Sequence, residues 1–238
     1  MKTENNAIQR VGILTSGGDA PGMNAAIRAI AIAAQHYQIE ILGFYGGFNG
    51  LIDDASTILT SVNVANIIHK GGTILKSARC PAMTTDVGIA QATTTLLKEK
   101  IDALIVIGGD GSFSGALALQ KQWSGQVIGI PGTIDNDIDG TDFTIGFSTA
   151  INTAIDAIDK IRDTAEAFER IFVVELMGRH SGHIAFNVGI ACAAEQVISF
   201  ENFPTAGNTE NNQAIKLNAL AKEIKQAQAN RHASYIIV

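Results

Sequence analysis

The sequence predicts an α/β fold, a Rossmann-like three-layer sandwich around a mostly parallel sheet. Short runs rich in β-branched residues alternate with longer helical patterns, as is typical of successive βαβ units. Most of the strand runs are apolar throughout rather than alternating, as expected for strands that helices cover on both faces. The 238 residues are enough for a sizeable core and for one large domain or two modest ones.

Composition excludes several classes of protein. Hydrophobic residues make up 46% of the chain and charged residues 17%, whereas disorder requires low hydrophobicity and high charge. The net charge of −6 argues against a nucleic-acid surface. Two cysteines do not make a disulfide framework and suit a reducing compartment, and the N-terminus MKTENNAIQR lacks the apolar core of a signal peptide. We therefore expect a cytoplasmic protein that contacts neither nucleic acid nor membrane.

The expected elements alternate along the chain. Strands are predicted at Arg10–Thr15, Ile39–Phe44, Ala103–Ile107, Val127–Ile130, Ile171–Leu176, Gln196–Ser199 and Tyr235–Val238. Helices are predicted at Met23–Gln35, Val64–Lys70, Gly88–Lys100, Ser112–Gln120, Thr149–Ala167, Ser181–Ala194 and Asn211–Ala229.

Unusual loops follow four of these strands. In chain order they read SGGDAPGMN, GGDGS, PGTIDNDIDG and MGRHSGH. Ligand sites of doubly wound sheets lie beyond the carboxyl ends of the strands, where these loops fall. Glycine and aspartate are also common in ordinary turns, which would explain one such loop more readily than four.

Two of the loops suit phosphate. Glycines at the start of a helix let backbone N–H groups approach an anion, and the helix dipole adds partial positive charge. Gly17 and Gly18 fit this role before one helix, and Gly108, Gly109 and Gly111 before another. The sequence contains no GxxxxGK[ST] motif, so the expected phosphate site is not of the Walker type.

Two of these loops, GGDGS and PGTIDNDIDG, carry the candidate metal-binding and catalytic carboxylates. Asp110 lies inside a glycine turn, where it would hold Mg²⁺ beside a polyphosphate or else act as a helix N-cap. Asp135, Asp137 and Asp139 are spaced by two, so an extended loop would place them on one side, with the hydroxyl of Thr133 nearby. Such a group can accept a proton during phosphoryl transfer, although a solvated acidic turn has the same pattern.

Three arginines are candidates for binding anions. Arg179 follows a strand and suits bidentate phosphate recognition. Arg79 is an equal candidate for a phosphate ligand or a surface residue, and Arg170, at the opposite end of its strand from Arg179, reads first as a surface residue. His180 and His183 lack a third ligand at a spacing typical of zinc sites.

Four other side chains are expected to pack rather than react. Cys80 and Cys192 fit as small apolar fillers, and Trp123 as a packing residue near the end of a helix. Phe48 is either a core residue or an aromatic platform for a base.

The order of these motifs resembles one family. The segments VGILTSGGDAPGMNAAIR, GGTILKSARCP, IVIGGDGS, PGTIDNDIDGTDFTIGFSTA and AIDKIRDTAEAFERIFVVELMGRHSGH are similar to those of bacterial-type ATP-dependent 6-phosphofructokinases. The resemblance implies transfer of the γ-phosphate of ATP to the 1-hydroxyl of fructose 6-phosphate, with Mg²⁺ as cofactor. It also implies a nucleotide-binding α/β domain over residues 1–145 and a partial fructose 6-phosphate-binding α/β domain over residues 146–238.

The resemblance further assigns roles by position. Asp135 would be the base, with Thr133, Asp137 and Arg179 as the other catalytic residues. The residues expected at ATP are Gly18, Arg79, Cys80, Gly109, Asp110, Gly111 and Ser112, with Asp110 at the metal. The residues expected at the sugar phosphate are Thr133, Ile134, Asp135, Arg170, Met177, Gly178 and Arg179, and Arg170 would serve a neighbouring subunit of a homotetramer.

The sequence departs from the family pattern in two places. Family members run to about 320 residues, so a chain that stops at Val238, inside an expected strand, is interpreted as truncated. Arg28 and Arg162 match cationic positions of the family's allosteric effector site, whereas Ile32 and Ser61 stand where arginines are usual.

The phosphate donor is the last open choice. The pyrophosphate-dependent branch of the family carries Asp after GGD and Lys before TIDND, where this chain has Gly111 and Gly132. These glycines favour ATP. The alternatives are a pyrophosphate-dependent enzyme and a nucleotide-binding fragment without catalytic competence.

Overall fold

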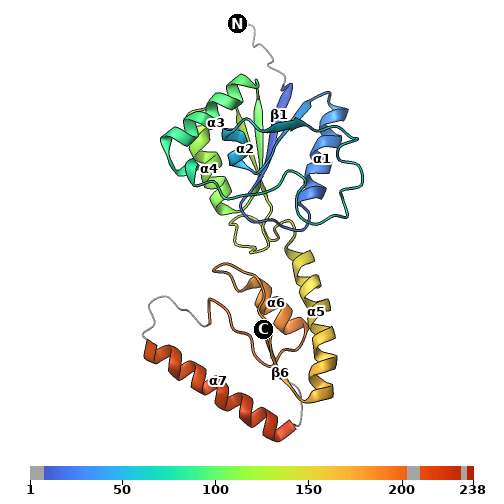
Figure 1. Ribbon diagram of the computed structural model, residues 1–238, viewed down its shortest axis with the longest axis vertical. Coiled ribbons are helices and arrows are strands. Elements are labelled where there is room, and N and C mark those ends of the chain that lie inside the picture. Colours follow the sequence, from blue (N-terminus) through green and yellow to red (C-terminus); the bar gives the residue numbers. More distant parts are fainter. Residues whose placement is uncertain (1–7, 203–209, 232–234) are drawn as a thin grey trace. The chain divides into compact units, whose positions relative to one another are not determined.

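The computed structural model describes residues 8–202, 210–231 and 235–238 and consists of two compact units (Figure 1). The first comprises Met1–Thr133 and Asp137–Gly146, and the second Ile134–Asn136 and Phe147–Val238. The chain therefore passes from the first unit to the second after Thr133, returns to the first at Asp137, and enters the second again at Phe147.

The first unit is built on a five-stranded sheet in the order β3-β2-β1-β4-β5. All neighbours pair in parallel except β3, which runs antiparallel to β2 at one edge. The strands are β1 (Arg10–Ser16), β2 (Glu40–Phe44), β3 (Ser56–Ile58), β4 (Ala103–Gly108) and β5 (Gln126–Pro131). This mostly parallel α/β arrangement confirms the predicted fold class.

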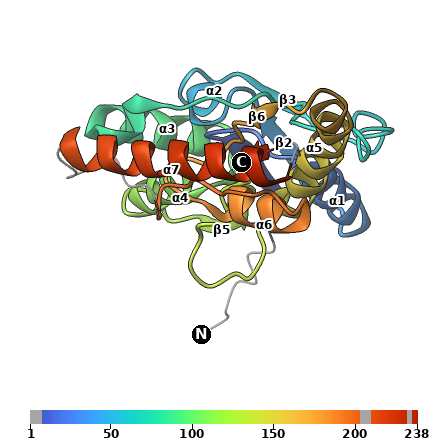
Figure 2. The same ribbon diagram turned by 90° about the horizontal axis from the view of Figure 1, so that it is seen from below.

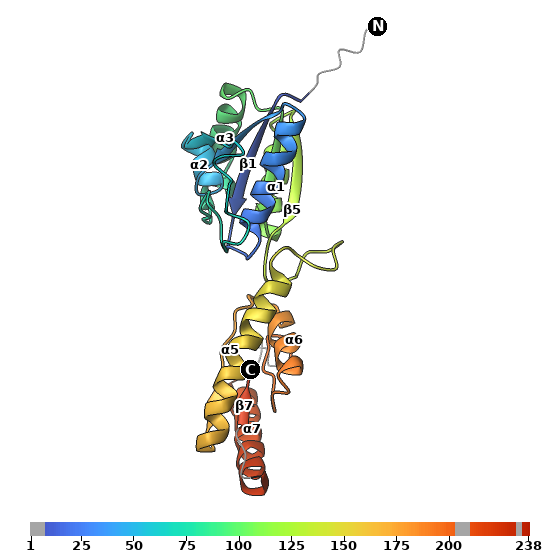
Figure 3. The same ribbon diagram turned by 90° about the vertical axis from the view of Figure 1, so that its right-hand side faces the viewer.

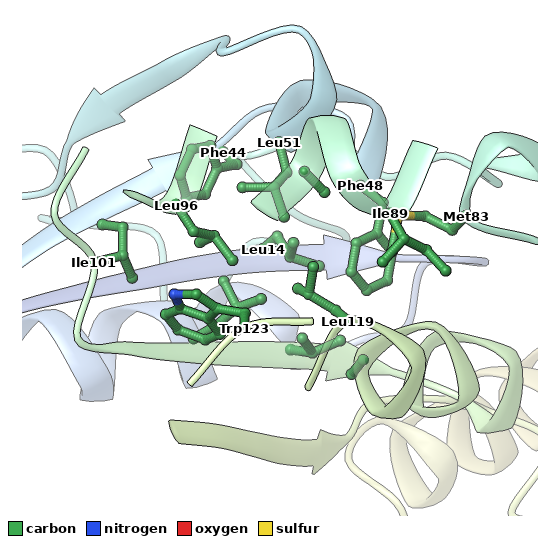
Figure 4. Packing of buried hydrophobic residues seen from close by; sticks show 14 of the residues in the cluster. Leu14, Phe44, Phe48, Leu51, Met83, Ile89, Leu96, Ile101, Leu119 and Trp123 are labelled. Atoms are coloured by element: carbon green, nitrogen blue, oxygen red, sulfur yellow. The ribbon is translucent and has the colours of Figure 1, made fainter. Parts of the chain in front are cut away.

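Helices cover both faces of this sheet (Figures 1 and 3). Helix α1 (Met23–His36) lies on one face, and α2 (Phe48–Ile52), α3 (Asp86–Lys98) and α4 (Asp110–Gln120) lie on the other, with the short 3-10 helix η1 (Pro81–Thr84) beside α3 and α4. Figure 4 shows Phe48 and Trp123 among the side chains of the main apolar cluster, where they are 2% and 4% exposed. Both are core residues, so Phe48 offers no surface to a base.

The second unit contains a parallel pair of strands, β6 (Ile171–Val173) and β7 (Tyr235–Ile237). Its helices are α5 (Phe147–Phe168), α6 (His183–Ala191) and α7 (Glu210–Arg231), shown in Figure 2. Helix α5 contacts both strands and packs on α6. Cys192 is buried in the apolar cluster of this unit, in agreement with its predicted role as a filler.

The expected helix at Val64–Lys70 is wrong, because the segment forms a series of turns. Asn66 has a φ of 56°, in the left-handed region that interrupts an α-helix. The side chain of Asn63 also accepts the Thr60 amide at 3.0 Å, which makes a local turn instead of a helical one.

The expected strand at Gln196–Ser199 reduces to one bridge between Gln196 and Ile237. The side chain of Asn202 accepts the Ser199 amide at 2.7 Å and donates to the Val197 carbonyl at 2.8 Å. The segment still pairs briefly with the end of β7, since the Val238 amide donates to the Gln196 carbonyl at 3.0 Å and the Ile198 amide donates to the Val238 carbonyl at 2.8 Å. The Asn202 bonds then hold Val197 and Ser199 in a local turn.

Other boundaries shift by smaller amounts. Strand β6 ends at Val173, three residues earlier than expected, whereas α2, β3 and η1 were not anticipated. The sequence also predicts a loose polar stretch at Asn202–Gln213, of which residues 203–209 lie outside the described residues and the rest, from Glu210, belongs to α7. In the part of the chain that the structure describes, no helix has the length and apolar character needed to cross a membrane.

Candidate active site

In the first unit, three segments meet at the carboxyl ends of β1 and β4. The hydroxyl of Ser112, in the first turn of α4, donates to the Ser16 carbonyl at 3.0 Å. The hydroxyl of Ser77 donates to the Gly17 carbonyl at 2.8 Å, and the Gly17 amide donates to Ala78 at 3.2 Å. The loop after β1, the segment from Ser77 and the start of α4 are therefore held together as one cradle.

Glycine is required at some positions of this cradle and leaves space at others. A Cβ on Gly108 would lie 2.6 Å from both the Ser112 hydroxyl and the Ser16 carbonyl, too close for any side chain. A Cβ on Gly18 or Gly111 would have no atom within 4 Å. Gly18 and Gly111 therefore leave open space in which a ligand can approach the backbone.

The N-terminus of α4 presents backbone donors to this space. Gly109 is the N-cap, and no side chain caps the helix. The amides of Ser112 and Phe113 bond to the Gly109 carbonyl, whereas no bond within the described residues is recorded for the amides of Asp110 and Gly111. An uncapped N-terminus beside open glycines is suited to an anion.

Asp110, the first residue of α4, is exposed in this position. Among the described residues, no three His, Cys, Asp or Glu side chains gather as a metal-ion cage. Mg²⁺ in phosphate-transfer sites is usually held by one or two carboxylates together with phosphate oxygens and water. Asp110 therefore fits a metal that arrives with a polyphosphate, and does not fit a resident protein-bound metal.

Thr133 lies beside this helix start. A Cβ on Gly109 would be 3.6 Å from the Cβ of Thr133, and the Thr133 carbonyl accepts the hydroxyl of Thr144 at 2.6 Å. The neighbouring Gly132 is packed tightly, since a Cβ there would come within 2.7 Å of Ile107. The backbone entering the TIDND segment is thus fixed by the first unit.

Arg79 and Cys80 follow the segment that holds Gly17. The Arg79 carbonyl accepts from the Asn49 side chain at 3.3 Å, and its side chain is exposed. Cys80 is half-buried against the main apolar cluster and precedes η1. Both residues therefore border the cradle, with Arg79 the one that can reach a ligand.

In the second unit, Asp135 contacts the MGRHSGH loop. Its Oδ1 accepts the Arg179 amide at 3.3 Å, and its carbonyl accepts the Ser181 hydroxyl at 2.6 Å. Gly178 has a φ of 151°, and a Cβ there would lie 2.5 Å from the Ser181 carbonyl, so glycine is required. Ile134, the residue before Asp135, packs on the apolar cluster of this unit and anchors the loop.

The remaining predicted substrate residues are exposed. Met177 is 76% exposed, and the side chain of Arg179 is also on the surface. The guanidinium of Arg170 lies 4.6 Å from the ring centre of Phe168, at the amino end of β6. Asp137 is exposed and belongs to the first unit, whereas Asp135, on the other side of Asn136, belongs to the second.

A carboxylate occupies the start of α6. Glu201 accepts the Gly182 amide at 2.7 Å, and this bond holds the pKa of Glu201 below its usual value. The ring of His183 packs edge-on to Phe147, and that of His180 to Phe200. The two histidines are thus engaged with aromatic rings.

The two expected effector arginines belong to different units. Arg28 is half-buried on α1 of the first unit. Arg162, on α5 of the second, donates to the carbonyls of Cys192 and Ala193 at the end of α6. Arg162 therefore has a local structural role, satisfying the carbonyls at a helix end.

Two positioning residues escaped the sequence reasoning. Ser77 and Ser181 each hold a loop by bonding to a backbone carbonyl, of Gly17 and of Asp135. Serines that bond a distant carbonyl carry no sequence pattern. The available signal is their place, Ser77 in the GGTILKSARCP segment and Ser181 directly after MGRH.

Comparisons with known proteins agree on one family. The phosphofructokinase family model matches residues 10–238. Curated proteins named ATP-dependent 6-phosphofructokinase are 53% identical over 80% of the chain in Bacillus pumilus and 49% identical over 97% of it in Coxiella burnetii. The chain spans about 60% of the length of the Bacillus protein and 67% of the Coxiella protein.

Solved structures give the same result. The T-state phosphofructokinase of Pichia pastoris superposes with a TM-score of 0.82 at 33% identity, over 100% of this chain and 26% of that one. A pyrophosphate-dependent phosphofructokinase from Marinobacter aquaeolei gives 0.71 at 18% identity over 97% of this chain and 60% of that one, a likeness that shows the fold alone.

Proposed function

Because the chain belongs to the phosphofructokinase family, we propose that it transfers the γ-phosphate of ATP to the 1-hydroxyl of fructose 6-phosphate. The observation that carries this proposal is the placement of Asp135. Its carboxylate accepts the Arg179 amide and its carbonyl accepts the Ser181 hydroxyl, in the loop where the chain leaves the first unit after Thr133.

The first unit takes the nucleotide in this proposal. The uncapped start of α4 and the open glycines Gly18 and Gly111 supply backbone donors for the phosphates, and Arg79 supplies a cation. This corresponds to the nucleotide-binding domain expected over residues 1–145. The Mg²⁺ that accompanies ATP would be held beside Asp110, where it neutralises phosphate charge.

The second unit and Asp135 take the sugar phosphate. Asp135 accepts the proton of the 1-hydroxyl while the hydroxyl oxygen of the sugar bonds to the γ-phosphorus. The bond from that phosphorus to the bridging oxygen of ADP breaks at the same time. Arg179 is exposed and directly follows Gly178, and its guanidinium stabilises the charge on the transferred phosphoryl group. Thr133, at the exit of the first unit, orients the transferring group.

Two glycines favour ATP over pyrophosphate as donor. Gly111 leaves the space that an α-phosphate needs, because a Cβ there would meet no atom within 4 Å. Gly132 leaves no space for a side chain, since the Cβ of a lysine there would lie against Ile107. An acidic side chain in place of Gly111 would repel the α-phosphate of ATP.

A second candidate function is nucleotide binding without turnover. The observation that favours it is the extent of the match, which spans about 60% of the length of the Bacillus relatives. In that case the cradle of the first unit would bind ATP without transfer of its γ-phosphate.

The test is product formation by the full chain. We expect fructose 1,6-bisphosphate, measured with a coupled assay, when the chain receives fructose 6-phosphate and Mg·ATP, and none with Mg·pyrophosphate. Turnover with pyrophosphate alone would contradict the donor assignment. Binding of ATP without turnover would replace the kinase by the second candidate.

A further inference from the structure

A long segment without regular structure carries Arg79 to the phosphate cradle. Residues 59–80 lie between β3 and η1 and contain turns, but neither helix nor strand. Such backbone lacks the ladder or helical bonds that fix a strand or a helix, and its position depends on other contacts. Arg79 can therefore meet a phosphate reproducibly only if side chains from elsewhere hold the second half of this segment in place.

The side chain of Asn24, in the first turn of α1, is the main anchor of this segment. Asn24 is 3% exposed. Its Nδ2 donates to the carbonyls of Lys70 and Gly71 at 3.0 and 3.2 Å, and its Oδ1 accepts the Ile74 amide at 2.7 Å. The backbone amide of Asn24 also donates to the Gly72 carbonyl at 3.2 Å. Both protons of the side-chain amide and its oxygen are therefore engaged with one short stretch of backbone.

Asn24 does not serve its own helix in the usual way. An asparagine near a helix start commonly bonds the amides of that helix. The N-cap of α1 is Gly22, and no side chain caps the helix. The side chain of Asn24 instead reaches backbone groups that lie 46 to 50 residues away in the sequence. Its bonds therefore fix the position of another segment rather than the start of α1.

A second anchor, a chain of hydroxyl groups, holds the next residues. Thr15, near the end of β1 and fully buried, donates to the Lys76 carbonyl at 2.9 Å. A hydroxyl has one proton, so in the 2.9 Å contact between the Thr15 and Thr73 hydroxyls the donor is Thr73. Thr73 in turn accepts the Leu75 amide at 3.2 Å, and Leu75 is itself fully buried. This part of the segment is thereby fixed to β1 and to the core.

These anchors are continuous with the cradle. Directly after them, Ser77 and Ala78 bond to Gly17 of the loop after β1, and the exposed Arg79 follows. Arg79 is the cation that this segment brings to the cradle, and a bond from a guanidinium to a phosphate depends on the direction of its donors. The place of the backbone at Arg79 therefore bears directly on how well a phosphate is held.

We propose that Asn24 is a positioning residue for nucleotide binding, which acts by holding the segment that ends in Arg79. The inference rests on the proposed function, because its ligand is the phosphate chain of ATP. Asn24 is buried and does not touch the ligand itself. It reduces the cost of ordering Arg79, since a side chain on a fixed backbone loses less conformational freedom when it binds.

The test is a double-mutant cycle on the full 238-residue chain, with the dissociation constant for Mg·ATP measured by calorimetry. Asn24→Ala should weaken ATP binding about fivefold, and Arg79→Ala about tenfold or more. The variant with both changes should bind like Arg79→Ala, to within about twofold, because Asn24 acts only through Arg79. A merely structural role of Asn24 would instead weaken binding by the same factor in both backgrounds.

Two further variants serve as a second probe and a control. Thr73→Val removes the hydroxyl at nearly constant volume and should weaken ATP binding in the same non-additive way, which keeps the test valid if Asn24→Ala does not fold. Ile27→Val, at a fully buried residue of α1, lowers stability without removing any of these bonds and should leave ATP affinity unchanged.

Hydrogen exchange without nucleotide tests the positioning separately. In Asn24→Ala the amides of Gly17 and Ile74 should exchange about tenfold faster, while those of β4 stay as protected as in the unaltered chain. Unchanged exchange at Gly17 and Ile74, or additive losses of ATP affinity in the cycle, would overturn this inference alone. Absence of Mg·ATP binding by the unaltered chain would overturn the proposed function together with it.

Discussion

Substitutions of single glycines in the phosphate cradle should affect protein stability and ligand binding separately. Gly108→Ala places a methyl group 2.6 Å from two oxygen atoms, so we expect a loss of about 1–3 kcal/mol in the free energy of unfolding. Gly18→Ala is the matched control, because its methyl group meets nothing within 4 Å and should leave stability unchanged while weakening ATP binding. Urea denaturation and calorimetry measure the two quantities. Equal stability of the two variants would refute the tight packing at Gly108.

The carboxylate of Asp135 provides the sharpest prediction about catalysis. Asp135→Asn keeps the shape and removes the ability to accept a proton, so kcat should fall by about 10²–10⁴-fold with ATP binding nearly unchanged. The measurement is the coupled assay of fructose 1,6-bisphosphate formation, with the unaltered chain as the reference. A loss below about fivefold would remove Asp135 from the role of base.

At the scale of elements, what the sequence predicts depends on whether the signal is local. The strands β1, β2, β4 and β5 lie within two residues of their predicted bounds, and the predicted glycine-rich loops follow β1, β4 and β5, because an apolar run and a glycine turn are local patterns. The expected helix at Val64–Lys70 failed because its apolar residues also suit buried turns, with Val64 at 0% exposure. The bonds from Ser77 and Ser181 to distant carbonyls could not be predicted, since they depend on tertiary placement.

The start of α6 should make the second unit sensitive to acid. The Gly182 amide lowers the pKa of Glu201 from its ordinary 4.5, so the bond stabilises the fold above that value and is lost as pH falls through the lowered pKa. Glu201→Gln should therefore flatten the decline of stability below about pH 4.5, measured by urea denaturation at a series of pH values. An unchanged decline would mean that Glu201 does not contribute to it.

At the scale of the whole molecule, we propose that the assembled enzyme is a symmetric homo-oligomer with shared sites. Arg170 directly precedes β6 and Arg179 follows that strand, so we expect that one chain does not bring both arginines to one substrate. Mixing inactive Asp135→Asn subunits with inactive Arg170→Ala subunits should restore part of the activity. Mixed oligomers without any recovery would place Arg170 outside a shared site.

The most direct test of the account is the affinity of the full chain for Mg·ATP, measured by calorimetry beside Gly111→Asp and Gly111→Asn. Open space at Gly111 means that neither variant should lose stability. The aspartate sets a like charge against the α-phosphate, so we predict a loss of at least about 100-fold in ATP affinity, or about 2.7 kcal/mol. The asparagine, with the same shape and no charge, should lose much less. Unaltered ATP affinity in Gly111→Asp, or no ATP binding by the chain itself, would contradict the assignment of this cradle to ATP.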